Sequence, residues 1–344
     1  MRCAKHLDVT SLRCRLLAII LASAFVCLWI IIESRMHSLD GPSSEHFVAF
    51  SKSISGADHT ATMTGVNGAR TCKKLLLIVI FNFPFSKNVP VLRLLYGDVF
   101  SKILFYADKA DAKWNVAKID VREGFFQHRV VADAMRRYPS YDGYMWIGDD
   151  VLLNYPFTLT QLNMSKLWLA GPDEVCFCTS NVERDLCRQH WQWEQQSGYS
   201  AAVNAVAHLP AKFKSRISDA FGNTGCLMKG ASDAGYIPAH YVSEFMLLAD
   251  IFRSVFFEFA IPSTFLLLSP GRESISFAKC FYSWGFNATA RFLEVERAWN
   301  STIEYVHPVK LSSLTQRTAA GHWLANARSQ FHQNKKPLSD LVCR

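Results

Sequence analysis

The chain has 344 residues, a net charge of +8 at pH 7 and a hydrophobic fraction of 50%. This length suits one large domain with appended segments, because a core of that size buries most of its apolar surface. The positive charge forms no dense run of Lys and Arg and no interleaved aromatic motif, which argues against a nucleic-acid partner and leaves an anionic small substrate open.

An uncharged apolar run, LLAIILASAFVCLWIII, covers residues 16–32. It is close to the shortest helix that spans a bilayer, about 17 residues. Basic residues precede the run and Glu33 follows it, so its N-terminal side is expected to stay in the cytosol. We therefore predict a cytosolic tail over residues 1–15, a transmembrane signal anchor over 16–32, and a type II membrane protein with its bulk in the lumen. A cleaved signal peptide is the alternative, although no small-x-small site follows the run.

Three Asn-x-Ser/Thr sequons agree with a lumenal location. They begin at Asn163, Asn287 and Asn300. Each is a candidate glycan acceptor if this part of the chain enters the secretory pathway.

The cysteines point to the same compartment. Seven of them follow the apolar run, and an oxidising lumen favours disulfides, although an odd number leaves at least one outside an intramolecular bridge. The cluster of Cys176, Cys178, Cys187 and His190 also resembles a zinc site. Zinc ligands usually include Cys pairs with two to four residues between them, and a lumenal compartment oxidises thiols, so the cluster favours disulfides over zinc.

Residues 33–72 are polar and small without a sustained apolar period, which predicts a stem. From Lys73 we predict a lumenal domain over residues 73–315, followed by a C-terminal tail over 316–344. Strands are expected at 75–81, 101–108, 117–121 and 143–148, with helices at 89–100 and 125–138 between them. Strands that alternate with helices predict an α/β fold, a mostly parallel sheet flanked by helices.

The second half of the predicted domain is less regular. Residues 222–238 are glycine-rich and end in a short predicted strand. Residues 239–269 are strongly apolar, but charged residues and Pro262 interrupt them, so they predict packed core helices and not a second membrane span. A further short strand is expected before Pro308.

Polar side chains follow the predicted strands at their carboxyl ends, namely Asn82, Asp108, Asp149 and Asp150. Ligands of parallel α/β sheets bind beyond these ends. An acid pair at such an edge can hold a divalent cation over phosphate oxygens, as Mn²⁺ and Mg²⁺ prefer. The alternative is a turn in which Asp149 and Asp150 are solvated or cap a helix.

The stretch GYMWIGDDVLLNYPFTL, residues 143–159, resembles the acidic metal-binding motif of glycosyltransferases with the GT-A fold. Together with FNFP (81–84), SKLWLAG (165–171) and FFEFAIPSTFLLL (256–268), it is similar to the STELLO-like group of Golgi type II membrane proteins. The resemblance covers residues 73–315. It implies a GT-A-like (nucleotide-diphospho-sugar transferase) domain that moves a sugar from a nucleotide-sugar donor to a glycan or glycoprotein acceptor.

The resemblance also implies roles for particular residues. Asp149, Asp150 and His307 would hold Mn²⁺ or Mg²⁺, although Gly-Asp-Asp departs from a strict Asp-x-Asp pattern and leaves open which acid touches the metal. Lys310, in the segment HPVK, would reach the diphosphate, with Asn82 and Asp108 as further contacts to the nucleotide sugar. The alternative for His307 and Lys310 is a solvated surface turn.

A carboxylate base is expected if the sugar is transferred with inversion. Glu258 is the first candidate, because an acid in so apolar a helix is costly to bury without a partner or a role. A salt bridge to Arg253 explains it equally well. Asp233 is the second candidate, since the small residues before it let a ligand approach the backbone, and a turn or helix cap is its alternative.

Two other functions remain open at this point. The STELLO resemblance also allows a non-catalytic scaffold that assists the assembly or trafficking of Golgi glycan-synthesising enzymes, in a complex with them. A metal-dependent phosphoester hydrolase would need more acidic ligands than the predicted strand ends offer.

Overall fold

The computed structural model describes residues 73–121, 124–170, 172–178, 196–221, 225–269, 272–283 and 287–333. All of them belong to one compact unit, residues 51–344. The predicted cytosolic tail, anchor and stem (1–72) lie outside the described residues, as do Cys187 and His190. Within the described ranges, no helix combines the length and hydropathy of a membrane span.

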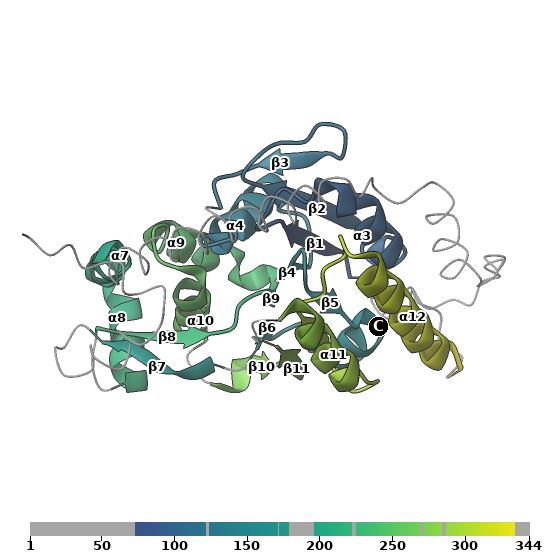
Figure 1. Cartoon of the computed structure of the whole chain (residues 1–344). Helices are drawn as coiled ribbons and strands as arrows, with labels where there is room; N and C mark the ends of the chain where they lie inside the picture. Colours follow the sequence, from purple (N-terminus) through teal and green to yellow (C-terminus); the bar gives the residue numbers. More distant parts are fainter. Residues whose placement is uncertain are drawn as a thin grey trace, which may run out of the picture. The chain divides into compact units, whose positions relative to one another are not determined.

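The centre of the fold is a seven-stranded sheet with the order β10-β6-β9-β4-β1-β2-β3 (Figure 1). Its strands are β1 (Leu75–Ile80), β2 (Lys102–Ala107), β3 (Val116–Lys118), β4 (Gly143–Gly148), β6 (Leu167–Leu169), β9 (Ala234–Pro238) and β10 (Ile275–Phe277). Strand β9 runs antiparallel to β4 and β6, and the other neighbouring pairs are parallel. The prediction of an α/β fold with a mostly parallel sheet is therefore confirmed.

Strands β1 and β4 lie at the middle of this sheet because their residues are apolar on both faces. All six residues of each strand are buried, as expected for a strand covered on both sides. Next to β4, Gly235 of β9 lies opposite Trp146. A Cβ atom at Gly235 would come within 2.1 Å of the Trp146 ring, so the indole occupies the space of the missing side chain.

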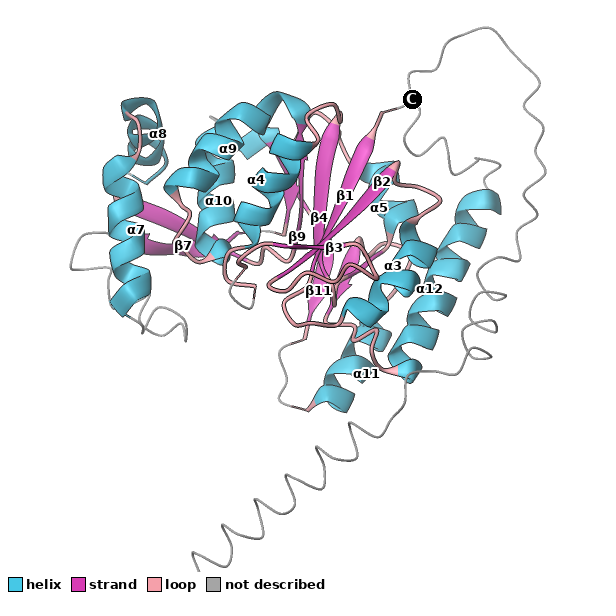
Figure 2. Cartoon of the chain, turned by 90° about the horizontal axis from the view of Figure 1, so that it is seen from above, coloured by secondary structure: helices cyan, strands magenta, loops and turns pink. Residues whose placement is uncertain are grey.

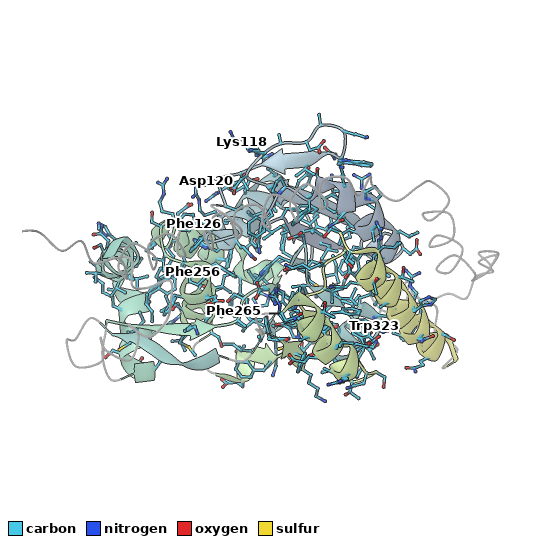
Figure 3. All side chains as sticks on the ribbon, viewed as in Figure 1. Lys118, Asp120, Phe126, Phe256, Phe265 and Trp323 are labelled. Carbon is cyan, nitrogen blue, oxygen red and sulfur yellow. The ribbon has the colours of Figure 1, made fainter. Side chains whose placement is uncertain are left out.

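Helices cover both faces of the sheet. The α-helices of the described residues are α3 (Val89–Tyr96), α4 (Gln127–Arg137), α5 (Tyr155–Gln161), α7 (Gln196–His208), α8 (Ala211–Phe221), α9 (Val242–Ile251), α10 (Phe257–Leu268), α11 (Ala288–Ala298) and α12 (Leu314–Gln333). Figure 2 shows α4, α9 and α10 on one side of the sheet and α3, α5 and α12 on the other. The Trp146 ring packs edge-on against Phe265 of α10, with ring centroids 6.0 Å apart. Figure 3 labels Phe265 among the side chains of the described residues.

Two smaller sheets complete the described part of the chain. Strands β11 (Cys280–Tyr282), β12 (Tyr305–His307) and β5 (Leu152–Leu153) form one, and β7 (Pro172–Cys178) pairs with β8 (Cys226–Gly230) in the other. In the latter, Cys178 lies opposite Cys226, and Cys226 is disulfide-bonded. Cys280 is present as a thiol.

The C-terminal segment differs from the expected tail. Residues 314–333 form helix α12, which packs against α5. Its Arg328 lies over the Tyr155 ring, 5.4 Å from the centroid, and its Nη2 is 3.4 Å from Asp98 Oδ2. The helix buries small and scattered apolar residues such as Ala320 and Leu324. This is a weak sequence signal, which is why the segment was expected to be a tail.

Candidate active site

A pocket of about 590 Å³ lies at the carboxyl ends of β1 and β4. Its volume falls within the range of small-molecule sites, about 300–1,000 Å³. Six residues predicted from the sequence as site residues line it: Asn82, Asp150, Asp233, Glu258, His307 and Lys310. The structure therefore brings together side chains from five separate parts of the chain.

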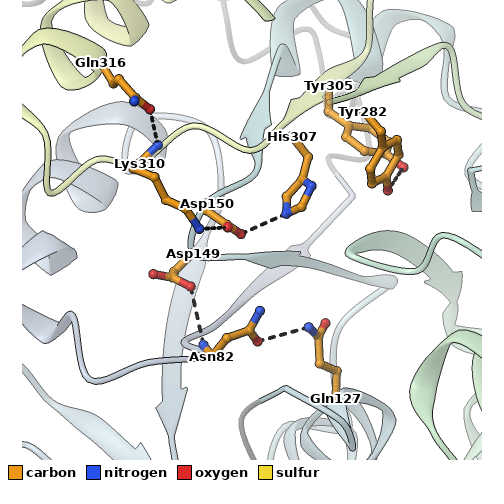
Figure 4. A network of polar contacts seen from close by, with 9 residues as sticks. All are labelled: Asn82, Gln127, Asp149, Asp150, Tyr282, Tyr305, His307, Lys310 and Gln316. Atoms are coloured by element: carbon orange, nitrogen blue, oxygen red, sulfur yellow. Dashed lines mark hydrogen bonds and ion pairs between the residues drawn. The ribbon is translucent and has the colours of Figure 1, made fainter. Parts of the chain in front are cut away.

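The two adjacent acids after β4 point to different partners (Figure 4). Both are buried. Asp149 Oδ1 accepts a long hydrogen bond, 3.4 Å, from the backbone nitrogen of Asn82 at the end of β1. Asp150 lines the pocket, whereas Asp149 is not among the lining residues. The geometry thus separates the pair into an acid beneath the site and an acid within it.

The pairing of β5 with β12 brings the late histidine to the acid pair. Strand β5 begins two residues after Asp150 and runs antiparallel to β12, which ends at His307. The backbone nitrogen of Val309 then donates a hydrogen bond to the backbone oxygen of Asp150, at 2.7 Å. This hydrogen bond joins two parts of the chain that are more than 150 residues apart, directly after the end of β4.

As a consequence, Asp150 lies between the His307 imidazole and the Lys310 ammonium (Figure 4). Its Oδ1 lies 3.2 Å from His307 Nε2, and its Oδ2 forms an ion pair with Lys310 Nζ. The backbone nitrogen of Lys310 donates to Gln316 Oε1 at 2.6 Å, which fixes the segment that carries the lysine.

The charges of the site follow from burial and from these contacts. Burial raises the pKa of Asp149 to about 7, with a further contribution from the Asp150 charge. Burial alone would also raise the pKa of Asp150, but His307 and Lys310 outweigh it and the pKa is lowered. For His307, burial lowers the pKa, but Asp150 and Asp233 reverse the sign and the pKa is raised. Asp150 is therefore the carboxylate that stays ionised.

The two predicted base candidates also lie in the pocket. Asp233 is in the turn between β8 and β9, and its backbone oxygen accepts a hydrogen bond from Gly148 at 2.7 Å. Its Oδ2 is buried without a hydrogen-bond partner among the described residues. Burial raises the pKa of Asp233, and the Asp150 charge adds to this. Glu258 is half-buried in the first turn of α10 and not in the middle of an apolar helix.

Asp108 has a different place from the one expected. It is not among the residues that line the pocket, and its Oδ1 accepts a hydrogen bond from the backbone nitrogen of Val121 at 2.7 Å. This contact ties the end of β2 to the loop before α4. A contact to a nucleotide sugar stays a prediction for Asp108, and the geometry of the pocket does not support it.

Several pocket residues were not singled out from the sequence. They are Phe83, Gly124, Phe125, Lys229, Ala231, Phe256, Phe257, Tyr282, Arg291 and Pro308. Phe83, Phe256 and Phe257 occur in the segments that carry the family resemblance, so a search around Asn82 and Glu258 would have found them. Nothing in the pattern around Arg291 or Tyr282 distinguishes these two from ordinary surface and core positions.

Part of this site fits a divalent cation. Among the described residues, no group of three or more His, Cys, Asp or Glu side chains is arranged to hold a metal. The 3.2 Å between Asp150 Oδ1 and His307 Nε2 nevertheless suits two neighbouring ligands of one octahedral ion, which lie about 3 Å apart at bond lengths of about 2.1 Å. Such ions usually take one or two protein ligands and complete their shell with water and phosphate oxygens. Asp150 and His307 therefore fit the cation, with the Lys310 ammonium as a competing partner of Asp150.

Comparison with known proteins identifies a similar group. No family model matches the chain. It is 26% identical over 259 residues to "Probable glycosyltransferase STELLO1" of Arabidopsis thaliana, which covers 72% of this chain and 32% of the relative. It is also 26% identical over 197 residues to "Probable glycosyltransferase STELLO2" of the same plant, covering 56% of this chain and 24% of the relative.

The chain is similar to the STELLO proteins. This confirms the resemblance expected from the sequence. The matched part spans about a third of the length of STELLO1 and a quarter of STELLO2. One solved structure, a glycosyltransferase involved in the glycosylation of the major capsid of PBCV-1, is 8% identical with a TM-score of 0.36 and covers 72% of this chain and 98% of its own. At that score the match carries no argument about this chain.

Proposed function

We propose that this protein is a metal-dependent glycosyltransferase with a GT-A-like domain, which moves a sugar from a nucleotide-sugar donor to a glycan or glycoprotein acceptor. One observation carries the proposal. The end of β4 places Asp150 in a pocket beside His307 and Lys310, with Asp233 and Glu258 on its wall. The similarity to two probable glycosyltransferases supports the same function.

The proposed metal ligands are Asp150 and His307, with Asp149 behind them. A bound Mn²⁺ or Mg²⁺ would supply positive charge for the diphosphate leaving group. Lys310 is within reach of the same group, because its ammonium already lies at Asp150. Arg291 and Lys229 line the pocket from other elements and add positive charge to its wall.

The base that would accept the proton of the acceptor hydroxyl is either Glu258 or Asp233. Glu258 lies in the first turn of α10 and is half-buried, so an incoming hydroxyl can reach it from the pocket. Burial raises the pKa of Asp233, which makes it a better proton acceptor than an ordinary carboxylate, but it is almost fully buried. We assign the base role to Glu258 first, for an inverting reaction, on the ground of access.

The cellular setting is part of the proposal. The apolar run at residues 16–32 would anchor a type II protein in the Golgi membrane, with the catalytic domain in the lumen. Support comes from the disulfide at Cys226, which suits an oxidising compartment. The asparagines of all three sequons are exposed.

One observation favours a second function, a non-catalytic scaffold for other Golgi glycan-synthesising enzymes. Both oxygens of Asp150 already contact groups of the protein itself, the His307 imidazole and the Lys310 ammonium. A site that is neutralised in this way stays folded without a metal. The scaffold would bind its partner enzymes in the absence of any nucleotide sugar.

Release of nucleoside diphosphate separates the two functions. The full-length protein in detergent is incubated with a panel of nucleotide sugars and Mn²⁺, and the released diphosphate is measured with and without chelator. The glycosyltransferase predicts metal-dependent release from one donor, lost in Asp150→Asn. Absence of release from every donor, by protein that is folded and binds partner enzymes, would leave the scaffold as the function.

A further inference from the structure

Asn82 follows β1 at the edge of the pocket, and a buried neighbour holds its side-chain amide. Gln127, the first residue of α4, is fully buried. Its Nε2 donates a hydrogen bond to Asn82 Oδ1 at 3.2 Å. Figure 4 shows the amide nitrogen of Asn82 turned away from Gln127. Because Asn82 lines the pocket, this nitrogen offers an N–H donor to a ligand.

The opposite orientation of the two amides is less favourable. In the observed arrangement Gln127 Oε1 is buried without a hydrogen-bond partner among the described residues. If both amides were turned over, the NH₂ group of Gln127 would be buried there instead. Buried N–H groups without an acceptor are rarer in folded proteins than carbonyl oxygens without a donor. The contact therefore sets the direction in which the Asn82 amide points.

Gly124 packs against the same Asn82 amide. Its φ of +91° lies in the region that favours glycine. A Cβ atom there would come within 2.4 Å of Asn82 Oδ1 and 2.7 Å of Cγ. The missing side chain of Gly124 therefore leaves the space that the Asn82 amide occupies in the orientation set by Gln127.

We propose that Gln127 and Gly124 position the Asn82 amide as a hydrogen-bond donor that selects uracil or guanine, because these bases have a carbonyl oxygen at the ring position where cytosine or adenine has an amino group. The inference rests on the proposed function, since it assumes a nucleotide-sugar donor. An amino group, as in cytosine and adenine at the corresponding position, would present a second donor to the Asn82 N–H and would be disfavoured.

The chemistry of the pocket wall favours the nucleoside over the diphosphate at Asn82. Phe83, Phe125 and Phe256 line the same pocket, and Phe83 is 52% exposed. Aromatic rings of this kind stack on the planar faces of bases. The Lys310 ammonium and the His307 imidazole, which suit a diphosphate, lie instead at Asp150.

The test is calorimetric binding of UDP, CDP, GDP, ADP and pyrophosphate to the full-length protein with Mn²⁺. We expect the carbonyl-bearing base to bind about tenfold tighter than its amino-bearing counterpart, UDP over CDP or GDP over ADP. Gln127→Met should bring this ratio close to one without changing the affinity for pyrophosphate. His128→Gln is the matched control, because His128 is the next buried residue on α4 and bonds to Phe252 and not to the pocket. Its ratio should equal that of the wild type.

A double-mutant cycle separates positioning from general damage to the fold. Asn82→Ala should abolish the ratio, and adding Gln127→Met to it should change nothing further. Gly124→Ala should also lower the ratio, because its Cβ would displace the same amide. Three results would each overturn this inference and leave the proposed function standing. They are a wild type that prefers CDP or ADP, an unchanged ratio in Gln127→Met, and a loss of pyrophosphate binding in Gln127→Met as large as its loss of nucleotide binding. A wild type that binds no nucleotide at all would overturn the proposed function with it.

Discussion

At the residue scale, the two adjacent acids are expected to differ in importance. Asp150 lines the pocket and contacts His307, whereas Asp149 lies beneath and accepts from the backbone of Asn82. We predict that Asp150→Asn lowers kcat/KM for donor turnover by at least about a hundredfold, the loss typical of a group that stabilises developing charge. Asp149→Asn keeps a similar shape and should cost less. Equal losses in steady-state assays of the two variants would contradict this assignment, and Asp98→Asn serves as an exposed acidic control.

Most of these residues can be predicted from the sequence, but the role of each one in the site cannot. Asn82, Asp149 and Asp150 follow strands, and strand ends can be located from apolar runs. His307 and Lys310 were found through family resemblance. Their place beside Asp150 depends on the pairing of β5 with β12 across more than 150 residues, which no local pattern encodes. Asp108 follows a strand end in the same way, but it accepts a hydrogen bond from Val121 and does not line the pocket, so a strand end alone does not identify a site residue.

At the element scale, a buried histidine links the start of α4 to the end of α9, and we predict that it makes the fold sensitive to acid. His128 Nε2 donates to Phe252 O at 3.0 Å, and burial lowers its pKa to about 3. Between the unfolded value of 6.5 and about 3, the unfolded chain binds one more proton than the folded chain. The free energy of unfolding therefore falls as the pH falls through this window, by up to about 1.4 kcal/mol per pH unit.

Replacing His128 tests that origin. His128→Gln retains an amide donor for Phe252 O but cannot titrate, so its unfolding free energy should fall less steeply between pH 7 and pH 5 than that of the wild type. Denaturant unfolding at both pH values measures the slope. If His128→Gln keeps the wild-type slope, another group causes the acid sensitivity.

The pairing of β4 with β9 offers a second test at this scale. Gly235 leaves the space into which the Trp146 ring fits, and a Cβ would lie 2.1 Å from that ring. Gly235→Ala should lower the free energy of unfolding by about 1–3 kcal/mol, the usual cost of overpacking a core. Lys118→Ala on the edge strand β3 should change it by less than about 0.5 kcal/mol. Thermal or denaturant unfolding measures both changes. An unchanged free energy of unfolding in Gly235→Ala would mean that the sheet relaxes around the added methyl group.

The elements themselves were predictable where apolar periodicity is strong. Strands β1, β2 and β4 and helices α3 and α4 lie close to their expected positions. The antiparallel insertion of β9 was not predictable, because direction within a sheet is set by the connection and not by the strand's own residues. Helix α12 was missed because it buries small residues such as Ala320 and lacks a clear apolar stripe.

At the scale of the whole molecule, the proposed lumenal orientation predicts glycans at all three sequons. Asn163, Asn287 and Asn300 are exposed. Protein from a secretory host should lose mass in three steps on partial deglycosylation, and a cytosolic chain should show none. At Asn287 the sequon is best removed by Thr289→Ala, because Asn287 Oδ1 caps α11 by accepting from Thr289 N at 2.8 Å and must be kept.

Resistance of full-length protein to carbonate extraction would test the anchor in the same preparation.

The central claim is that Asp150 and His307 hold a metal that binds the nucleotide donor in this pocket. Calorimetric titration of nucleoside diphosphates into the full-length protein, with and without Mn²⁺, tests it most directly, in the wild type and in Asp150→Asn. We predict metal-dependent binding of at least one diphosphate to the wild type and its loss in Asp150→Asn. Binding that is equally strong without metal, or that survives in Asp150→Asn, would contradict the account.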